Sequence, residues 1–204
     1  MSEHYFTDRP RSKAKPGQFT VELRGRSYTF HTDAGVFSRT GLDLGTEILI
    51  EMLPGRPGDV VLDLGCGYGA LGIAAADLVG PAGHAYLVDV NERAVELAAQ
   101  NIKANGILNA TALKSDGLRA LPGLSFDLIA SNPPIRAGKK VVYRILREGY
   151  EALRPGGRLL VVIRTKQGAK SLARYLEELA GNCETLKRKS GYRILQVVNT
   201  PPPE

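Results

Sequence analysis

From Asp59 onward, short runs of β-branched and aliphatic residues alternate with segments of helical periodicity, and this alternation constrains the fold more than any other feature. Strands that alternate with helices predict a parallel sheet covered by helices on both faces. The strand-like runs span residues 60–64, 84–88, 110–113, 126–130 and 158–163, and most are apolar enough to be buried on both faces. Helices are expected to fill the gaps between them.

Three of these helices have clear ends. One begins at Asn91, a favourable N-cap, and ends before Gly106. A second spans about residues 139–153 and stops at the sequence RPGG, residues 154–157, and a third spans about residues 168–179.

Both ends of the chain predict antiparallel additions. Runs 185–189 and 192–198, joined through Ser190 and Gly191, indicate a hairpin that completes the sheet. Upstream, runs 19–23 and 28–31 indicate a small hairpin that turns at residues 24–27, followed by a helix over about residues 43–52. We therefore expect an α/β fold, a Rossmann-like, doubly wound, seven-stranded sheet with an antiparallel C-terminal hairpin. Residues 1–52 are expected to be a lead-in packed on a core of residues 53–200, in one compact domain.

Composition narrows the functional classes. A chain of 204 residues with 43% hydrophobic residues can bury a two-sided sheet without disulfides or metals. Cys66 and Cys183 are far apart and lack a nearby His cluster, so we expect no metal site, and a reducing cytoplasm fits best. The sequence shows no signal peptide and no membrane-spanning run, so no membrane partner is expected. The net charge of +6 favours an anionic partner such as RNA, although solubility would account for it equally.

The segment DLGCGYG, residues 63–69, follows a predicted strand and opens a helix, so its glycines let the backbone approach a ligand closely. Gly65, Gly67 and Ala70 also satisfy a relaxed dinucleotide fingerprint, in which a pyrophosphate sits on the helix N-terminus. The Asp63 carboxylate opposes that ligand, because like charges about 4 Å apart repel by about 4 kcal/mol at an effective dielectric of about 20. The same carboxylate attracts the ammonium and sulfonium groups of S-adenosylmethionine, which is therefore the expected cofactor. A glycine-rich turn without a ligand remains the alternative.

Further cofactor contacts are expected where the next two strands end. Asp89 ends one strand, where a carboxylate can accept hydrogen bonds from both ribose hydroxyls. Asp116 follows the next strand and can accept from the adenine amine, although either carboxylate could instead cap a helix. The predicted cofactor-binding residues are Asp63, Gly65, Cys66, Gly67, Gly69, Asp89, Val90, Ser115, Asp116, Gly117 and Asn132.

The sequence SNPPI, residues 131–135, follows the fourth strand and predicts the transfer site. Two consecutive prolines stiffen this loop and leave carbonyls that no sheet ladder uses. The Asn132 side-chain oxygen and the Pro133 carbonyl can each accept a hydrogen bond from a substrate amine, which aims the nitrogen lone pair at the sulfonium methyl group. Asn132, Pro133 and Pro134 are therefore the predicted catalytic residues, and an ordinary turn is the alternative.

With these motifs in this order, residues 35–198 resemble the methyltransferase small domain family. The sequences GVFS at 35–38 and GLDLG at 41–45 add to the resemblance, and segments 132–140 and 165–169 are most similar to compact archaeal-type members. The resemblance implies a class I fold and an N-methyltransferase similar to the bacterial ribosomal RNA guanine-N2 enzymes. Protein-glutamine methyltransferases of the same family use the same loop and remain an alternative. The chain departs from most amine-directed members at Ile135, where they carry a Tyr or Phe that stacks on the acceptor.

The resemblance and the positive charge together lead us to expect ribosomal RNA as the partner, in the cytoplasm. Lys140, Arg144 and Arg147 recur on one face of a helix beside the transfer loop and could hold phosphates, or could simply form a solvated charged surface. A non-catalytic RNA-binding module and a dehydrogenase are the alternatives from other classes. The predicted substrate-binding residues are Phe37, Ile135, Arg136, Lys139 and Lys140.

Overall fold

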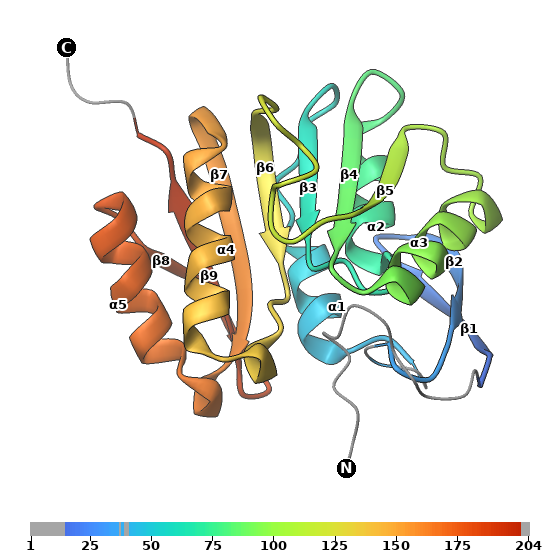
Figure 1. Cartoon of the computed structure of the whole chain (residues 1–204), viewed down its shortest axis with the longest axis horizontal. Coiled ribbons are helices and arrows are strands. Elements are labelled where there is room, and N and C mark those ends of the chain that lie inside the picture. The colour runs from blue at the N-terminus through green and yellow to red at the C-terminus, as the bar shows by residue number, and fades with distance from the viewer. Residues whose placement is uncertain (1–14, 37, 39–40, 201–204) are drawn as a thin grey trace.

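The computed structural model describes residues 15–36, 38 and 41–200, which form a seven-stranded sheet and a separate two-stranded hairpin (Figure 1). The strands are β1 (Gly17–Leu23), β2 (Arg26–Thr32), β3 (Val60–Leu64), β4 (His84–Asp89), β5 (Ala110–Lys114), β6 (Phe126–Ser131), β7 (Leu153–Arg164), β8 (Glu184–Lys189) and β9 (Tyr192–Val198). The helices are α1 (Leu44–Glu51), α2 (Ala70–Val79), α3 (Glu92–Ala104), α4 (Lys139–Glu151) and α5 (Ala169–Ala180), with short 3-10 turns η1 (Ile135–Ala137) and η2 (Thr165–Gln167). No helix among these described residues is long and apolar enough to cross a bilayer.

The large sheet has the strand order β5-β4-β3-β6-β7-β9-β8, in which the first five are parallel and the last two are antiparallel additions. Two hydrophobic clusters cover its faces. One joins the sheet to α1, α2 and α3 and includes Leu49 and Ile73, and the other joins it to α4 and α5 and includes Leu146 and Leu176. The predicted doubly wound fold with an antiparallel C-terminal hairpin is therefore confirmed.

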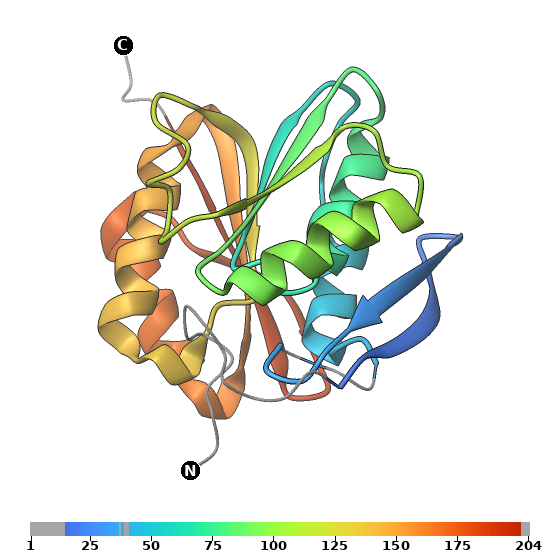
Figure 2. The same ribbon diagram turned by 45° about the vertical axis from the view of Figure 1, so that its right-hand side comes forward.

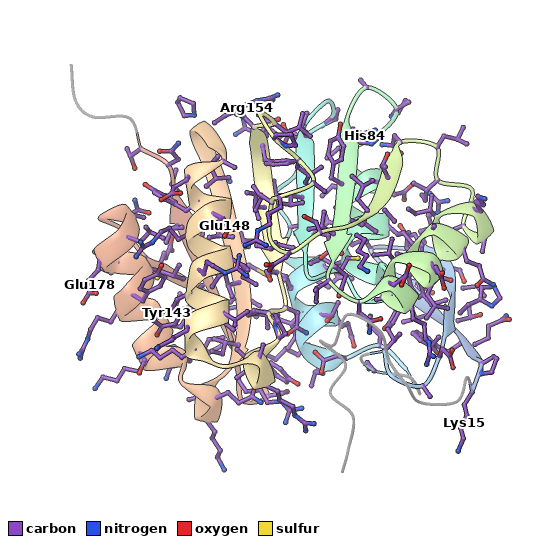
Figure 3. All side chains as sticks on the ribbon, viewed as in Figure 1. Lys15, His84, Tyr143, Glu148, Arg154 and Glu178 are labelled. Atoms are coloured by element: carbon purple, nitrogen blue, oxygen red, sulfur yellow. The ribbon has the colours of Figure 1, made fainter. Side chains whose placement is uncertain are left out.

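The parallel strands all end at the lower edge of the sheet in Figure 1, where α1, η1, η2 and the β8–β9 turn also lie. His84 and Arg154, labelled in Figure 3, mark the opposite edge, where β4 and β7 begin. In open α/β sheets, ligands bind outside the carboxyl ends of the strands. The lower edge is therefore where a site is expected.

Three local predictions were wrong. No helix fills the gap between β5 and β6, because residues 115–125 contain Gly117, Pro122 and Gly123 and form turns. Strand β7 begins at Leu153, five residues earlier than predicted, because the RPGG sequence lies within the strand, where the pairing with β6 shifts register, and α4 already ends at Glu151. The first hairpin turns on two residues rather than four: Arg24 and Gly25 both have positive φ, at 50° and 77°, as a type I′ turn requires.

The outer edge of β2 lies beside α3 (Figure 2), and it pairs with the side chains of Asn101 and of the C-cap Asn105 rather than with another strand. Asn105 accepts from the Thr29 amide at 3.0 Å and donates to the Thr29 carbonyl at 2.9 Å, and Asn101 does the same for His31 at 2.7 and 2.9 Å. Residues four apart on a helix are separated by nearly the same distance as residues two apart on a strand. The side-chain amides of Asn101 and Asn105 are therefore spaced to pair with His31 and Thr29. This pairing satisfies the backbone groups that a bare edge would leave open.

Aromatic packing joins the hairpin to the glycine loop. The Phe30 and Phe19 rings lie 5.6 and 5.9 Å from the Tyr68 ring, centroid to centroid, and Asn101 also donates to the Tyr68 carbonyl at 2.9 Å. Leu23, Tyr28 and Phe30 belong to the same hydrophobic cluster as α1, α2 and α3. The hairpin is thus packed into the core that supports the glycine loop.

We predict that Asn101→Ala lowers the free energy of unfolding by about 2–4 kcal/mol, because it leaves the half-buried His31 amide and the carbonyl of the buried Tyr68 without partners, each at a cost of about 1–3 kcal/mol. The measurement is urea unfolding. The neighbouring substitution Gln100→Ala, at an exposed position of α3, is the matched control and should change stability by less than about 0.5 kcal/mol. Equal effects of the two substitutions would contradict a role for the edge pairing.

Candidate active site

A cavity of about 390 Å³ opens at the carboxyl edge of the sheet, between the ends of β3, β4, β5 and β6. It brings together most residues that the sequence predicted for the cofactor and the transfer step. Those in its wall are Asp63, Gly65, Cys66, Gly67, Asp89, Val90, Ser115, Asp116, Gly117, Asn132, Pro133 and Pro134. The agreement follows from topology, since parallel strands place their carboxyl ends side by side.

The glycine loop leaves β3 at Leu64 and is tied to β4. The amides of Gly65 and Cys66 both donate to the Val88 carbonyl at 2.9 Å, and the Gly67 amide donates to Oδ2 of Asp89 at 2.9 Å. Gly65 and Gly67 have φ of 83° and 55°, a conformation that disfavours a side chain. The backbone itself therefore forms this wall of the cavity.

Gly69, which is predicted to bind the cofactor, does not line the cavity, and that role stays a prediction. Its φ is 93°, and a Cβ there would lie 3.0 Å from Leu87 and 3.1 Å from Ala98, so the glycine lets α2 pack closely on β4 and α3. Gly72 has the same function more stringently, because its Cβ would lie 2.3 Å from the Leu87 side chain. No local sequence pattern identifies Gly72, since a glycine within a helix is merely unfavourable until its packing neighbour is known.

Asp63 is buried, with 1% of its surface exposed, and its Oδ2 accepts from the Gly72 amide at 2.8 Å. That amide belongs to the first turn of α2, whose partial positive charge favours a carboxylate. Burial, with a smaller contribution from the nearby Asp89, raises the pKa of Asp63 to about 8. The carboxylate therefore fixes the start of α2 and presents an acidic group to the cavity.

Asp89 accepts from two backbone amides, Gly67 to Oδ2 and Asn91 to Oδ1, each at 2.9 Å. Burial raises its pKa, while these hydrogen bonds act in the opposite direction. Asn91 is the N-cap of α3, and its side chain accepts from the amides of Arg93 and Ala94. Asp89 is thus not needed as the side-chain cap, and it remains available at the cavity wall.

Asp116 lies in the cavity wall, but its carboxylate is engaged. Arg144 donates to Oδ1 at 2.5 Å and Arg119 lies 3.2 Å from Oδ2, while Arg144 also contacts Glu148 of α4, labelled in Figure 3. Arg144 itself lines the cavity. Of the predicted phosphate-binding face, Arg144 is turned to the cavity, Arg147 donates to the Tyr175 hydroxyl at 3.3 Å, and Lys140 is exposed. The phosphate-binding role of this face stays a prediction.

In the transfer loop, residues 131–135, the side chain of Asn132 is held through its amide nitrogen. Nδ2 donates to Oδ2 of Asp43 at 3.1 Å and to Oγ1 of Thr46 at 2.9 Å. An ionised carboxylate can only accept, so the NH2 group faces Asp43 and the side-chain oxygen remains as the acceptor. The Pro133 carbonyl, expected to be open to an acceptor, already accepts from the Ile135 amide at 2.8 Å and retains one lone pair.

The four predicted substrate-binding residues that the structure describes lie outside the wall of the cavity. Phe37 lies outside the described residues. Ile135 is half-buried and packs against the core under α4 and α5, while Arg136, Lys139 and Lys140 are exposed at the rim. The wall beside the transfer loop includes instead Ala137, Val141 and Ile145, aliphatic residues that no sequence motif marks.

A doubly wound sheet with a glycine loop after β3, carboxylates at the ends of β3 and β4, and an Asn-Pro-Pro loop after β6 defines a class I methyltransferase. The model of the methyltransferase small domain family matches residues 27–196. The chain therefore belongs to the methyltransferase small domain family, and the predicted class of enzyme, an S-adenosylmethionine-dependent methyltransferase, is confirmed at the level of the family.

The regions that match this chain cover different shares of the length of each relative. YbxB of Bacillus subtilis (strain 168) is 41% identical over 200 residues, which cover 96% of this chain and 98% of that protein. Ribosomal RNA small subunit methyltransferase C of Pseudomonas entomophila (strain L48) is 40% identical over 167 residues, or 78% of this chain and 48% of that one. The chain thus spans about half the length of the curated ribosomal RNA methyltransferase but nearly all of YbxB.

Among solved structures, the T. thermophilus 16S rRNA N2 G1207 methyltransferase in complex with AdoMet and guanosine has a TM-score of 0.82 and 31% identity. The match covers 93% of this chain and 52% of that one. A methyltransferase from Pyrococcus furiosus has a TM-score of 0.64 and 25% identity, over 76% of this chain and 81% of that one.

We predict that Asp63→Asn removes a pH dependence of stability in the cofactor-free protein. Between about pH 4 and pH 8 the folded protein retains a proton on Asp63 that the unfolded chain has released, so its stability falls as pH rises through this window. The neutral variant lacks this slope and should melt at a higher temperature than the wild type at pH 8. Thermal melting from pH 5 to pH 8 measures the effect.

The control is Asp59→Asn, which removes a carboxylate immediately before the start of β3. This variant should keep the wild-type dependence of melting temperature on pH. The same slope in Asp63→Asn as in the wild type would show that Asp63 carries no proton in this range.

Proposed function

We propose that this chain is an S-adenosylmethionine-dependent N-methyltransferase of ribosomal RNA, with an exocyclic guanine amine as the acceptor. The observation that carries the proposal is the fixed amide of Asn132, because a carbonyl oxygen in the cavity wall suits an acceptor that bears N–H groups. The ribosomal RNA methyltransferases to which the chain is similar support the class of acceptor. Such a substrate implies action in the cytoplasm.

The residues of the cavity fit the cofactor. Gly65 and Gly67 leave room for close approach, and Asp63 and Asp89 place two acidic groups in that wall, whose ionised forms a bound cation would favour. In the proposed arrangement Asp89 accepts from the ribose hydroxyls, and Asp116 serves the adenine end, where Arg144 shares its carboxylate. When bound, S-adenosylmethionine supplies an electrophilic methyl group on a sulfonium.

The chain contributes orientation rather than a strong base. The Asn132 oxygen accepts an N–H of the acceptor and aims the nitrogen lone pair into the cavity, and the remaining lone pair of the Pro133 carbonyl can accept the second N–H. With the cofactor bound, the nitrogen held by Asn132 and Pro133 would take the methyl group while the sulfonium left as a neutral thioether, and the nitrogen would then lose its proton to water. The two prolines keep the loop stiff during the step.

A basic rim extends along the lower edge of the sheet on the β6–β8 side of the cavity, and its exposed cations suit RNA phosphates. The Thr165 amide donates to the Gly191 carbonyl at 2.8 Å, so the β8–β9 turn lies beside the end of β7, at the lower edge in Figure 1. The exposed cations of this rim are Arg136, Lys139, Lys140, Arg164, Lys166, Arg188 and Lys189. Phosphate contacts of this kind supply much of the affinity of proteins for nucleic acids.

We predict that Asn132→Ala lowers kcat for methyl transfer by about 10²–10³, the usual loss on removing one well-placed polar group from an active site. The affinity for S-adenosylmethionine should change only a few-fold. The assay follows labelled methyl groups from S-adenosylmethionine into ribosomal RNA isolated from a strain that lacks the gene, and mass mapping then identifies the modified nucleoside.

Gln167→Ala removes an exposed amide from the same edge of the sheet and is the matched control, which should keep full activity. Unchanged transfer by Asn132→Ala would overturn the proposed mechanism. Label in protein rather than RNA would favour a protein-glutamine acceptor, and a wild-type chain that binds RNA without transferring methyl groups would indicate a binding module.

We predict that Arg188→Glu combined with Lys189→Glu weakens RNA binding by at least about tenfold at moderate salt and makes the dependence of log K on log salt shallower. The measurement is a salt titration of RNA binding. The control pair, Arg56→Glu with Lys103→Glu, changes the net charge equally at exposed positions toward the opposite edge. An equal loss in the control pair would mean that net charge, rather than the rim, attracts the RNA.

A further inference from the structure

A chain of hydrogen bonds leads from Asn132 away from the cavity. Nδ2 of Asn132 donates to Oδ2 of Asp43 at 3.1 Å, and the Tyr192 hydroxyl donates to Oδ1 of the same carboxylate at 3.2 Å. Nε of Arg164 in turn donates to the Tyr192 hydroxyl at 2.9 Å, and its guanidinium lies 4.9 Å from the centroid of the Tyr192 ring. Both oxygens of Asp43 thus have defined partners.

Asp43 is held rigidly at the start of α1. As the N-cap, its Oδ2 accepts from the Thr46 amide at 3.1 Å. Tyr192 packs directly on the same turn, since a Cβ at Gly45 would lie 2.6 Å from its ring. Asp43 does not line the cavity, whereas Asn132 and Thr46, to which it is hydrogen-bonded, both do.

The two ends of an Asn side chain are nearly equal in size, so only their hydrogen-bond partners decide which end faces the cavity. Thr46 cannot decide, because a hydroxyl both donates and accepts. The Asp43 carboxylate can decide, because it repels the amide oxygen and attracts the NH2 group. With the amide reversed, an NH2 group would meet the N–H groups of the acceptor, and no hydrogen bond would form.

We propose that Asp43, fixed by Tyr192 and by its capping of α1, is a positioning residue that sets the orientation of the Asn132 amide for methyl transfer. The role of Asn132 in transfer rests on the function proposed above. The orientation itself is a property of the folded chain, and it can be measured without activity.

Asp43→Ser tests this proposal, because Ser is as good an N-cap as Asp. Its side chain is too short to reach the Asn132 amide, and its hydroxyl can both donate and accept, so it cannot fix the orientation of the amide. We expect kcat to fall about tenfold, the loss of one hydrogen bond to a charged group, with the affinity for S-adenosylmethionine and the melting temperature nearly unchanged. Tyr192→Phe keeps the ring and removes only the hydroxyl, and should cost a few-fold in kcat. Its control is Tyr150→Phe, at a half-buried tyrosine of α4, which should cost nothing.

A double-mutant cycle separates positioning from an independent effect. If Asp43 acts through Asn132, Asp43→Ser causes no further loss of transfer in the Asn132→Ala background, whereas multiplied losses would overturn the proposal. The activity-independent readout is the NMR signal of the Asn132 side-chain amide, identified by its absence in Asn132→Ala. This signal should shift in Asp43→Ser and stay in place in Tyr150→Phe. An unmoved signal in Asp43→Ser overturns the positioning proposal even if transfer falls. If the signal shifts in Asp43→Ser but Asn132→Ala retains full transfer, the role of Asn132 in the proposed function is overturned instead.

Discussion

The hydrogen bond between the buried Asp63 carboxylate and the Gly72 amide is the contact on which the rest of the site depends. It joins the end of β3 to the first turn of α2, so the glycine loop between them has both ends fixed. The loop is also tied to β4 through the Val88 carbonyl and the Asp89 carboxylate. A buried carboxylate is costly without such partners, and its raised pKa reflects that cost. The fold accepts this cost at the point where a cationic cofactor is expected to bind.

The lead-in segment contributes to the same site from the other side. Its hairpin is paired with Asn101 and Asn105 of α3 and packs on Tyr68 of the glycine loop. Its helix α1 begins with Asp43 and Thr46, which hold the transfer loop. The lead-in segment, which precedes the sheet in the sequence, therefore supports both the glycine loop and Asn132.

The sequence predicted the sheet and the glycine loop well, because strand alternation and glycine spacing are local signals. It also placed most of the cavity wall, since parallel strands bring their carboxyl ends to one edge. It did not predict the tight approach of Gly72 to Leu87, the turning of Arg144 toward Asp116, or the contact of Asp43 with Asn132. Each joins residues at least 15 positions apart in the chain, and no local pattern encodes which distant partner a side chain meets.

Ile135, where most amine-directed members carry an aromatic residue, affects how the affinity for RNA is shared between the cavity and the basic rim. Its side chain packs against the core under α4 and α5, and the wall beside the transfer loop consists of the aliphatic Ala137, Val141 and Ile145. A base covered by aliphatic carbon lacks the stacking term of about 1–3 kcal/mol that an aromatic ring supplies. Under the proposed function, the affinity for RNA must then depend more on the phosphates held by the basic rim, while Asn132 selects the nitrogen that receives the methyl group.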